Sequence, residues 1–367
     1  MIKFIVEQKN FLKALQKVSI LLLKNHNIAI LENVLINVNG NIMTVTSTNL
    51  ETQITVYTTI ISQDINKSTI VSGRKLLSIC KSIPNNSVIK VYVNEKKMLI
   101  KSNNSVFELL IVSETSFPLL KSFNHEMTFV VSQSIIKNMI HNTQFAMAIN
   151  DVRYYLNGIL FEINENQLKM VATDGHRLAV SSVHLDNRYN FYSVIISRKG
   201  VLELIKLLNN RDIKLILFLN KNNIRIKIHN TVFISKLIEG NYPEYNNVLL
   251  QYPKIKIKIP TLQLKNALLR VSILSDKKFQ SVKFCFCKDQ LELRSNNEEE
   301  EKAKEIININ IIKEEIAFNM NVNYIIDILN NMTEEYVFFS FNIPVCSVHI
   351  QEDQQSNNIF VVMPLLL

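Results

Sequence analysis

The chain contains little glycine and cysteine and no tryptophan. Of its 367 residues, 6 are glycine and 4 are cysteine. Neither G-x-G-x-x-G nor G-x-x-x-x-G-K-[ST] occurs, so binding of dinucleotides or nucleoside triphosphates lacks its usual signal. Four cysteines provide no disulfide framework in a chain of this length, which fits a reducing cytosol. No stretch approaches the roughly 18 uninterrupted apolar residues that span a bilayer, and the first residues lack the layout of a signal peptide.

Apolar and basic residues, by contrast, are abundant. Hydrophobic residues make up 47% of the chain, and 41 Lys and Arg against 32 Asp and Glu give a formal net charge of +9. This apolar fraction is ordinary for a packed globular protein, and the length suggests two or three domains. Lysine outnumbers arginine 32 to 9. Codon drift in an AT-rich genome would produce this bias, so a single lysine carries little information.

The sequence contains three copies of one pattern. A helical pattern of apolar residues occurs at residues 74–81 (RKLLSICK), 198–206 (RKGVLELIK) and 323–330 (NYIIDILN). Each copy precedes a run rich in β-branched and aromatic residues, at 88–93, 214–219 and 336–341, which predicts a strand. Each copy then closes on a bulky residue followed by proline, at Pro118, Pro243 and Pro364. Three copies in register are hard to obtain by chance.

A predicted strand followed by a predicted helix also opens each copy. The strands are at residues 3–6 (KFIV), 128–131 (TFVV) and 255–259 (IKIKI), and apolar residues at helical spacing follow each of them. We therefore predict an α+β protein of three similar domains, at residues 1–125, 126–252 and 253–367. Each domain would contain the order strand, helix and strands twice over.

Positive charge is concentrated in the first domain. Residues 1–125 carry 14 basic and 7 acidic residues, residues 126–252 carry 14 and 10, and residues 253–367 carry 13 and 15. The last third contains the acidic run Glu298 to Glu301, followed by Glu305. A basic first third and an acidic last third could associate head to tail, and such heterologous contacts close into rings when the rotation permits. A solvated acidic loop is the alternative interpretation.

Basic residues also recur along the predicted helices. Lys9, Lys13 and Lys17 lie four residues apart on one helical face, a spacing that destabilises a helix unless an anion offsets the charge. The phosphate backbone of nucleic acid is a candidate anion, and it would be bound through charge without base preference. Tyr154 and Tyr155 could stack on bases or lie at a strand edge. For any single lysine, a solvated surface is the alternative.

Two candidate chemical sites are weak. Asp174 and His176 in VATDGHRLA could suggest acid–base chemistry, but Gly175 between them indicates a tight turn in which the aspartate bonds its own main chain. No Ser or Cys nucleophile motif accompanies them. Cys285 and Cys287 alternate along a predicted strand, and no second pair follows at zinc-site spacing. We therefore expect no catalytic residue, no metal and no cofactor.

Several blocks of the sequence resemble one protein family. They are KFIVE at residues 3–7, LQKVS at 15–19, QFAM at 144–147, DVRYYLNG at 151–158, TDGHRLA at 173–179 and VVMP at 361–364. With the threefold repeat, they resemble the bacterial sliding clamp, the beta subunit of DNA polymerase III, along the whole chain. The resemblance implies a head-to-tail homodimeric ring of six similar domains, with sheets outside and helices lining the central hole.

This resemblance also implies a function without catalysis. Such a ring encircles duplex DNA, slides without sequence preference and tethers the replicative polymerase as a processivity factor. The implied partners are duplex DNA, a second copy of the chain, the polymerase alpha subunit and the clamp loader, with other polymerases, ligase and mismatch-repair proteins as further candidates. The implied location is the bacterial cytoplasm, at the nucleoid during replication. Two other interpretations stay open: a monomeric DNA-binding scaffold, and an enzyme that uses Asp174 and His176.

Three groups of site residues follow from the resemblance. An apolar cleft that captures short motifs of partner proteins is implied at Leu156, Thr173, Gly175, His176, Arg177, Leu178, Pro243, Val248, Val345, Ser347, Val361, Val362, Met363 and Pro364. The residues implied to face DNA are Lys24, Arg74, Asn150, Tyr154, Tyr155, Arg198 and Lys199. In the ring contact, Phe107 and Leu109 would meet Ile273 and Leu274 of the next chain, and Lys75 and Lys97 would face Glu299 and Glu301.

The chain departs from the family pattern in four respects. Asn25 stands where the family has a DNA-contacting arginine, and Lys24 is its candidate substitute. Asn247 replaces an arginine at the cleft edge, and the chain ends in Leu365-Leu366-Leu367 where members often carry Met-Arg-Leu. The resemblance therefore predicts a more apolar cleft with fewer partners. Familiar clamps are acidic whereas this chain is basic, so we hypothesise stronger nonspecific binding to DNA.

Overall fold

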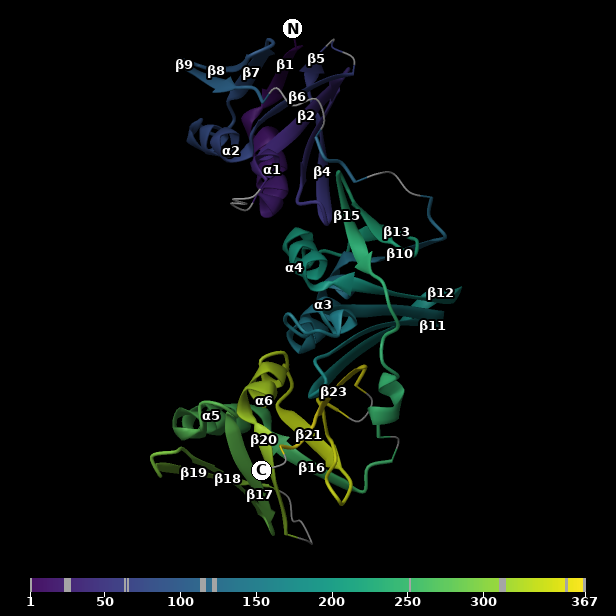
Figure 1. Ribbon diagram of the computed structural model, residues 1–367, viewed down its shortest axis with the longest axis vertical. Helices are drawn as coiled ribbons and strands as arrows, with labels where there is room; N and C mark the ends of the chain where they lie inside the picture. Colours follow the sequence, from purple (N-terminus) through teal and green to yellow (C-terminus); the bar gives the residue numbers. More distant parts are fainter. Residues whose placement is uncertain are drawn as a thin grey trace. The chain divides into compact units, whose positions relative to one another are not determined.

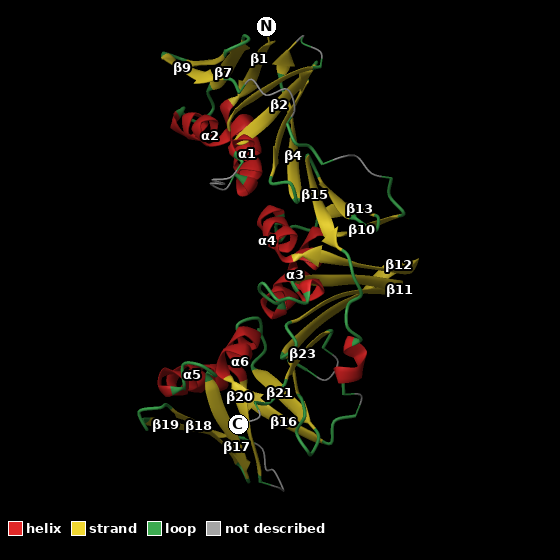
Figure 2. Ribbon diagram, in the orientation of Figure 1, coloured by secondary structure: helices red, strands yellow, loops and turns green. Residues whose placement is uncertain are grey.

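The structure is a computed structural model that describes residues 2–22, 28–62, 64, 66–112, 117–120, 124–250, 252–309, 315–353 and 356–365. The chain forms two compact units. The first comprises Met1–Lys137 with Lys199–Glu239, and the second comprises Asn138–Arg198 with Gly240–Leu367. Helices and antiparallel strands occur in both units, and Figure 1 and Figure 2 show them along the chain. No helix in the described residues is long and apolar enough to cross a membrane.

The first unit consists of antiparallel sheets with helices packed against them. One sheet has the order β5-β1-β7-β8-β9, and another has the order β10-β13-β14-β15-β4-β3-β2-β6. Its elements are β1 (Ile2–Glu7), α1 (Gln8–Val18), β2 (Asn33–Asn39), β3 (Ile42–Thr48), β4 (Thr52–Thr59), β5 (Ile61–Ser62), β6 (Lys67–Ser72), α2 (Gly73–Ser82), β7 (Val88–Val93), β8 (Lys97–Ser102), β9 (Ser105–Leu110), β10 (Met127–Ser132), α4 (Arg198–Leu207), β13 (Lys214–Leu219), β14 (Asn223–Ile228) and β15 (Thr231–Ile238).

The second unit has the same kind of architecture. One sheet has the order β16-β21-β22-β23-β12-β11, and a four-stranded sheet has the order β19-β18-β17-β20. The helix α3 (Gln133–Thr143) begins in the first unit and ends in the second. The other elements are β11 (Gly158–Thr173), β12 (Arg177–Ser197), β16 (Ile255–Pro260), α5 (Thr261–Val271), β17 (Ser281–Cys287), β18 (Gln290–Asn296), β19 (Lys302–Asn308), β20 (Ile316–Asn321), α6 (Val322–Leu329), β21 (Tyr336–Phe341), β22 (Val348–Gln351) and β23 (Asn358–Val362).

The threefold repeat predicted from the sequence is present in the strand pairing. The first strand of each repeat pairs antiparallel with the strand that follows its second helix: β1 with β7, β10 with β13, and β16 with β21. The second helices α2, α4 and α6 begin and end within one residue of the predicted ranges 74–81, 198–206 and 323–330. The α+β class and the repeated order of elements are thereby confirmed.

Apolar spacing decides which face of each element is buried. In α1, Phe11, Ala14, Leu15 and Val18 are buried at helical spacing, and β1 buries every second residue. Burial of a large apolar side chain contributes about 1.5–3 kcal/mol, so each helix packs its apolar stripe against a sheet. The opposite face of α1 carries polar residues, which agrees with the amphipathic pattern read from the sequence.

Candidate functional site

A small cleft in the second unit gathers ten of the residues predicted for partner binding. Its volume is about 200 Å³. The turn between β11 and β12, the end of β23 and two 3₁₀ turns, Tyr154–Leu156 and Tyr245–Val248, form its walls. The lining residues are Arg153, Tyr155, Leu156, Thr173, Gly175, His176, Arg177, Leu178, Pro243, Glu244, Tyr245, Val248, Val361 and Met363.

The β11–β12 turn is fixed by side chains that bond its own main chain. Asp174 Oδ1 accepts hydrogen bonds from the N–H groups of His176 at 2.9 Å and Arg177 at 3.0 Å. Thr173 Oγ1 accepts one from the Gly175 N–H at 3.1 Å. Gly175 has a φ of 92°, a conformation that side-chain-bearing residues rarely adopt. The predicted tight turn is therefore present, and the Asp174 carboxylate supports it by accepting main-chain hydrogen bonds.

Arg177 connects this turn to α6. Its Nε donates to Asp174 Oδ2 at 3.0 Å and its Nη1 donates to Asp327 Oδ2 at 2.6 Å. The guanidinium carbon lies 4.5 Å from the ring centroid of Tyr324 and 5.5 Å from that of Phe145. Only 12% of the Arg177 side chain is exposed. Two carboxylates and two aromatic rings thus hold one guanidinium in place at the cleft wall.

A second arginine, Arg153, also contacts the turn. Arg153 donates from Nε to Asp151 Oδ1 at 3.0 Å and from Nη2 to Asp151 Oδ2 at 2.8 Å. These side-chain hydrogen bonds lower the pKa of Asp151 to about 2. A Cβ added to Gly175 would lie 3.2 Å from Arg153 Nη1. The glycine therefore lets the bidentate pair approach the turn closely.

The C-terminal strand supplies the apolar floor. β23 pairs with β12, which sets Val361 opposite Leu178, and the Met363 N–H donates to His176 O at 2.9 Å. Val361 and Leu178 are buried, whereas Met363 is 40% exposed. A methionine at the mouth above a rigid aliphatic floor gives a surface that adapts to several apolar ligands.

Two hydrogen-bonded tyrosines support the remaining wall. Tyr242 Oη accepts from the Thr173 N–H at 3.0 Å, and burial raises the pKa of Tyr242. Tyr245 Oη donates to Glu162 Oε1 at 3.1 Å.

His349 on β22 adds support behind the 3₁₀ turn at Tyr245–Val248. Its Nε2 lies 3.0 Å from Val248 O and 3.2 Å from the Leu250 N–H. The ring is buried, and burial lowers the pKa of His349. A neutral imidazole therefore supports the segment that carries Val248 into the cleft.

Four residues predicted for the cleft do not line it. Val345 and Pro364 line a separate hollow of about 470 Å³ beside Ile343 and Leu365. Val362 is fully buried in β23, and Ser347 precedes β22.

Four lining residues were absent from the predicted cleft, namely Arg153, Tyr155, Glu244 and Tyr245. The DVRYYLNG block contained the first two, and the other two directly follow Pro243. The resemblance predicts that Tyr155 faces DNA, and nothing in the sequence distinguishes it from Tyr154.

The arginines predicted to face DNA bond main-chain carbonyl groups. Arg74 donates to Leu22 O from Nε at 3.1 Å and from Nη2 at 2.8 Å. Arg198 Nη1 donates to Met147 O at 3.2 Å, and burial lowers the pKa of Arg198. Both side chains are partly buried, so each has part of its guanidinium committed to its own unit.

The other predicted DNA-facing residues differ in exposure. Lys199 Nζ lies 3.4 Å from Glu51 Oε1. Asn150 is exposed, with a φ of 54°. Tyr154 is exposed in a 3₁₀ turn, with its ring 5.9 Å from that of Tyr155 in an edge-to-face arrangement. The alternative placement of these tyrosines at a strand edge is therefore wrong. Lys24 and Asn25 lie outside the described residues.

The residues predicted for the ring contact lie on two strands, on the helix α2 and in two turns. Phe107 and Leu109 are on β9, and Ile273 in a 3₁₀ turn after α5 is 77% exposed, with Leu274 beside it. Lys97 Nζ lies 2.7 Å from Glu108 Oε2 within its own sheet. The remaining predicted residues of this contact are exposed: Lys75, Glu299 and Glu301.

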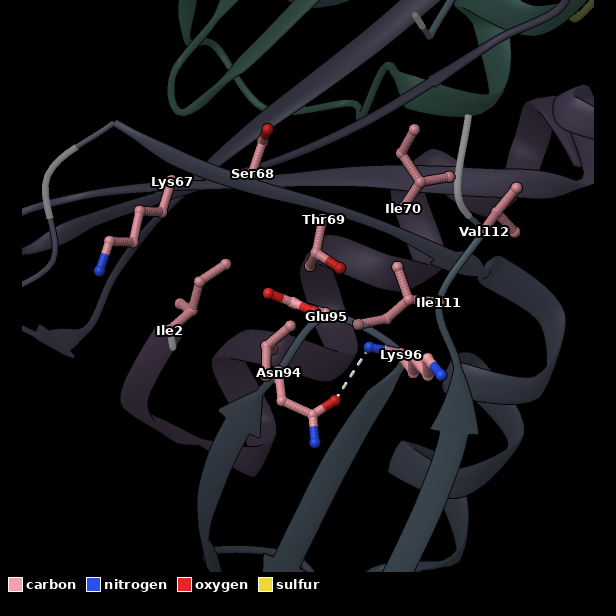
Figure 3. Close-up of a pocket in the computed structure, with 11 residues that line it drawn as sticks. Ile2, Lys67, Ser68, Thr69, Ile70, Asn94, Glu95, Lys96, Ile111 and Val112 are labelled. Carbon is pink, nitrogen blue, oxygen red and sulfur yellow. Dashed lines mark hydrogen bonds between the residues drawn. The ribbon is translucent and has the colours of Figure 1, made fainter. Parts of the chain in front are cut away.

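A larger hollow in the first unit contains none of the predicted site residues. It lies between β6, the β7–β8 turn and the residues after β9, and its volume is about 760 Å³. Figure 3 shows the residues that line it. Its walls mix apolar side chains such as Ile2 and Ile111 with the charged Glu95 and Lys96. The Thr69 hydroxyl is buried there without a hydrogen-bond partner among the described residues. Ten of the predicted partner-binding residues instead line the cleft of the second unit.

The described residues hold no group of three or more His, Cys, Asp or Glu side chains that could bind a metal ion. Cys285 and Cys287 lie on β17 as predicted, and burial raises the pKa of the Cys285 thiol.

Comparisons with known proteins agree along the whole chain. Family models of the DNA polymerase III beta subunit match residues 2–121 (N-terminal domain), 130–244 (central domain) and 247–366 (C-terminal domain). The chain is 40% identical over 363 residues to the beta sliding clamp of Buchnera aphidicola subsp. Acyrthosiphon pisum, covering 99% of each chain. It is 37% identical over 365 residues to the beta sliding clamp of Escherichia coli K12, covering 100% of each.

Solved structures give the same result. A DNA polymerase sliding clamp from Pseudomonas aeruginosa superposes with a TM-score of 0.96 at 33% identity, covering 100% of both chains. A sliding clamp from the same organism bound to griselimycin superposes with a TM-score of 0.94 at 33% identity, again covering 100% of both.

Proposed function

Because this chain belongs to the DNA polymerase III beta subunit family, the bacterial sliding clamps, we propose that two copies close head to tail into a ring around duplex DNA. The chain has the three-domain clamp fold and is a processivity factor of DNA replication, without catalytic activity of its own. We propose domain limits at 1–125, 126–252 and 253–367. The bacterial cytoplasm, at the nucleoid, is the proposed location.

The cleft of the second unit is the proposed docking site for polymerases and other partners. Its apolar floor, its exposed methionine and the Arg177 network support this proposal. A short segment with aliphatic or aromatic side chains would fill a volume of about 200 Å³. Val345, Ser347 and Pro364 would act as an outer part of the site. Griselimycin, which is bound to the P. aeruginosa clamp, is proposed to bind the same cleft here.

DNA would be held by side chains that read no bases. The proposed contacts are Lys24, Arg74, Asn150, Tyr154, Tyr155, Arg198 and Lys199. Lys9 and Lys13 add exposed charge on α1. Charge contacts of this kind bind the phosphate backbone weakly and permit sliding.

The proposed ring contact has an apolar part and a charged part. In the apolar part, Phe107 and Leu109 of one chain would meet Ile273 and Leu274 of the next. In the charged part, Lys75 and Lys97 would face Glu299 and Glu301. The clamp loader, ligase and mismatch-repair proteins are proposed as further partners.

Topological retention on DNA tests the ring. The protein is loaded onto a nicked circular plasmid with a bacterial clamp loader and ATP, and the complex is isolated by gel filtration. Retention on the circle and release after one restriction cut are the expected results. Equal retention on circular and linear DNA would support the monomeric scaffold instead. In parallel, the sedimentation mass should be twice the 42.4 kDa of one chain.

A further inference from the structure

Two strands of the described structure each end a sheet. β9 pairs only with β8 in the order β5-β1-β7-β8-β9, and β19 pairs only with β18 in the order β19-β18-β17-β20. Both edges carry exposed apolar side chains: Val106 (58%), Leu110 (73%) and Ile306 (49%). Unpaired edges of this kind readily accept a further strand.

The sheet that ends in β19 has an excess of positive charge on one face. Lys283 on β17 lies opposite Arg294 on β18, which lies opposite Lys304 on β19. Like charges directly opposite one another destabilise a sheet. Glu292 offsets part of this positive charge, because its carboxylate pairs with Arg294 and its Oε2 lies 3.1 Å from Lys304 Nζ.

Lys302 lies at the unpaired edge of the same face. It lines a hollow of about 490 Å³ with the three other cations, and the structure gives it no ion-pair partner among the described residues. The predicted third domain, residues 253–367, is acidic as a whole, but this face of its four-stranded sheet is cationic. At the β19 edge of the face, no carboxylate pairs with Lys302 among the described residues.

β9 carries a carboxylate, that of Glu108, on the exposed face of its sheet. Leu109 is buried and Glu108 is exposed, since successive side chains of a strand point to opposite faces. Glu108 Oε2 lies 2.7 Å from Lys97 Nζ, with 55% and 52% of the two side chains exposed. A pair this exposed contributes little energy by itself, so its carboxylate can take a second cation without losing the first.

Each of the two sheets has a helix packed on one face, and this determines which side chains would share a face if β9 paired with β19 of a second copy. α2 packs by β9, and α5 packs by β19 (Figure 1). Glu305 of β19 bonds Arg270 of α5 at 2.7 Å, so the neighbouring Lys304, and Lys302 with it, point away from α5. If a strand of a second copy extends the sheet with helices on the same side, Glu108 and Lys302 lie on one outer face.

We infer that Glu108 of one copy forms an ion pair with Lys302 of the next copy, and that this pair makes the ring selective for copies of this chain. The inference rests on the proposed ring. Lys97, Glu108 and Lys302 would then alternate in sign across the junction. A partner with the opposite signs on its two edges would bring like charges together, which costs affinity.

Charge exchange tests the pair in the full-length protein. The dimer dissociation constant is measured by analytical ultracentrifugation at low salt for the unchanged chain, Glu108→Lys, Lys302→Glu and the double variant. Each single variant should weaken the dimer about tenfold, and the double variant should recover to within about threefold of the unchanged chain. Both effects should shrink in high salt because the pair is exposed. Lys227→Glu, an exposed change on β14 with the same change in charge as Lys302→Glu, should leave the constant unchanged.

Two outcomes separate this inference from the ring itself. If the unchanged chain dimerises and neither single variant weakens it, or the double variant is as weak as the singles, the Glu108–Lys302 pair is refuted while the ring stands. If the unchanged chain sediments as a monomer at every concentration, the proposed ring fails. Circular dichroism melts of each variant show whether the folded state is retained.

Discussion

Replacement of Arg177 by alanine removes the contact that ties the cleft turn to α6. The guanidinium is the shared partner of Asp174, at 3.0 Å, and Asp327, at 2.6 Å, and it lies over the ring of Tyr324. All of these groups belong to the second unit. Arg177→Ala should therefore lower the stability of that unit and weaken ligand binding in the cleft together.

The magnitude follows from what each partner loses. Hydrogen bonds to charged groups contribute about 1.5–3 kcal/mol each, and a cation–π contact contributes about 0.5–2 kcal/mol. Asp174 keeps two main-chain donors, and the Asp327 side chain is 42% exposed, so water can solvate it. The loss should therefore be smaller than the roughly 3–5 kcal/mol of a fully buried pair that loses one member. We expect the free energy of unfolding to fall by about 2–3 kcal/mol.

Urea unfolding and calorimetric titration with griselimycin measure the two effects. The dissociation constant should rise about tenfold, or about 1.4 kcal/mol. Arg188→Ala on the same strand β12 is the matched control, because Arg188 is exposed, and it should change neither quantity. An Arg177→Ala protein with the stability and affinity of the control would refute the reasoning.

Three further changes test other parts of the structure. Gly175→Ala places a Cβ at a residue with a φ of 92°, and this Cβ lies 3.2 Å from Arg153 Nη1. The free energy of unfolding, measured with urea, should fall by about 1–2 kcal/mol. An unchanged urea midpoint would contradict this expectation. Burial lowers the pKa of His349, so the folded protein binds fewer protons there than the unfolded chain, and stability should fall as the pH drops below about 6.5. His349→Gln should flatten that dependence in urea midpoints. Burial raises the pKa of Glu203, so stability should fall as the pH rises from about 4.5 through the folded pKa. Glu203→Gln should remove this fall in stability. If the stability of the variant changed with pH in parallel with that of the unchanged protein, the expectation would be wrong.

The sequence predicted the repeated elements well because their signals are local. Helical spacing of apolar residues and runs of β-branched residues are sufficient to predict α2, α4 and α6 with the strands that follow them. Strand pairing across repeats needed the structure, since the residues that pair β4 with β15 are far apart in the chain and carry no shared local pattern. The partition into two compact units was likewise absent from the local signal.

The sequence located residues that line the cleft where a motif marked them, and it missed others where long-range packing decided the surroundings. The TDGHRLA block predicted the turn, because Gly175 and Asp174 are typical of one. The Asp327 partner of Arg177 is 150 residues away, and no pattern in the sequence joins the two. Val362 was predicted for the cleft from a contiguous motif, yet alternation along β23 turns it into the core while Val361 lines the cleft.

The lysine repeat of α1 shows how far charge patterns in a sequence can be trusted. Lys9, Lys13 and Lys17 share one face by spacing, but Lys17 donates to Asn230 Oδ1 at 3.1 Å and Thr231 Oγ1 at 2.8 Å. Burial and the neighbouring Lys13 lower the pKa of Lys17. Two lysines of the repeat therefore remain exposed for phosphate, and the third is a structural contact between α1 and the β14–β15 turn. Because only neutralised phosphates release counterions, the salt dependence of DNA binding should follow the exposed cations rather than the net charge of +9.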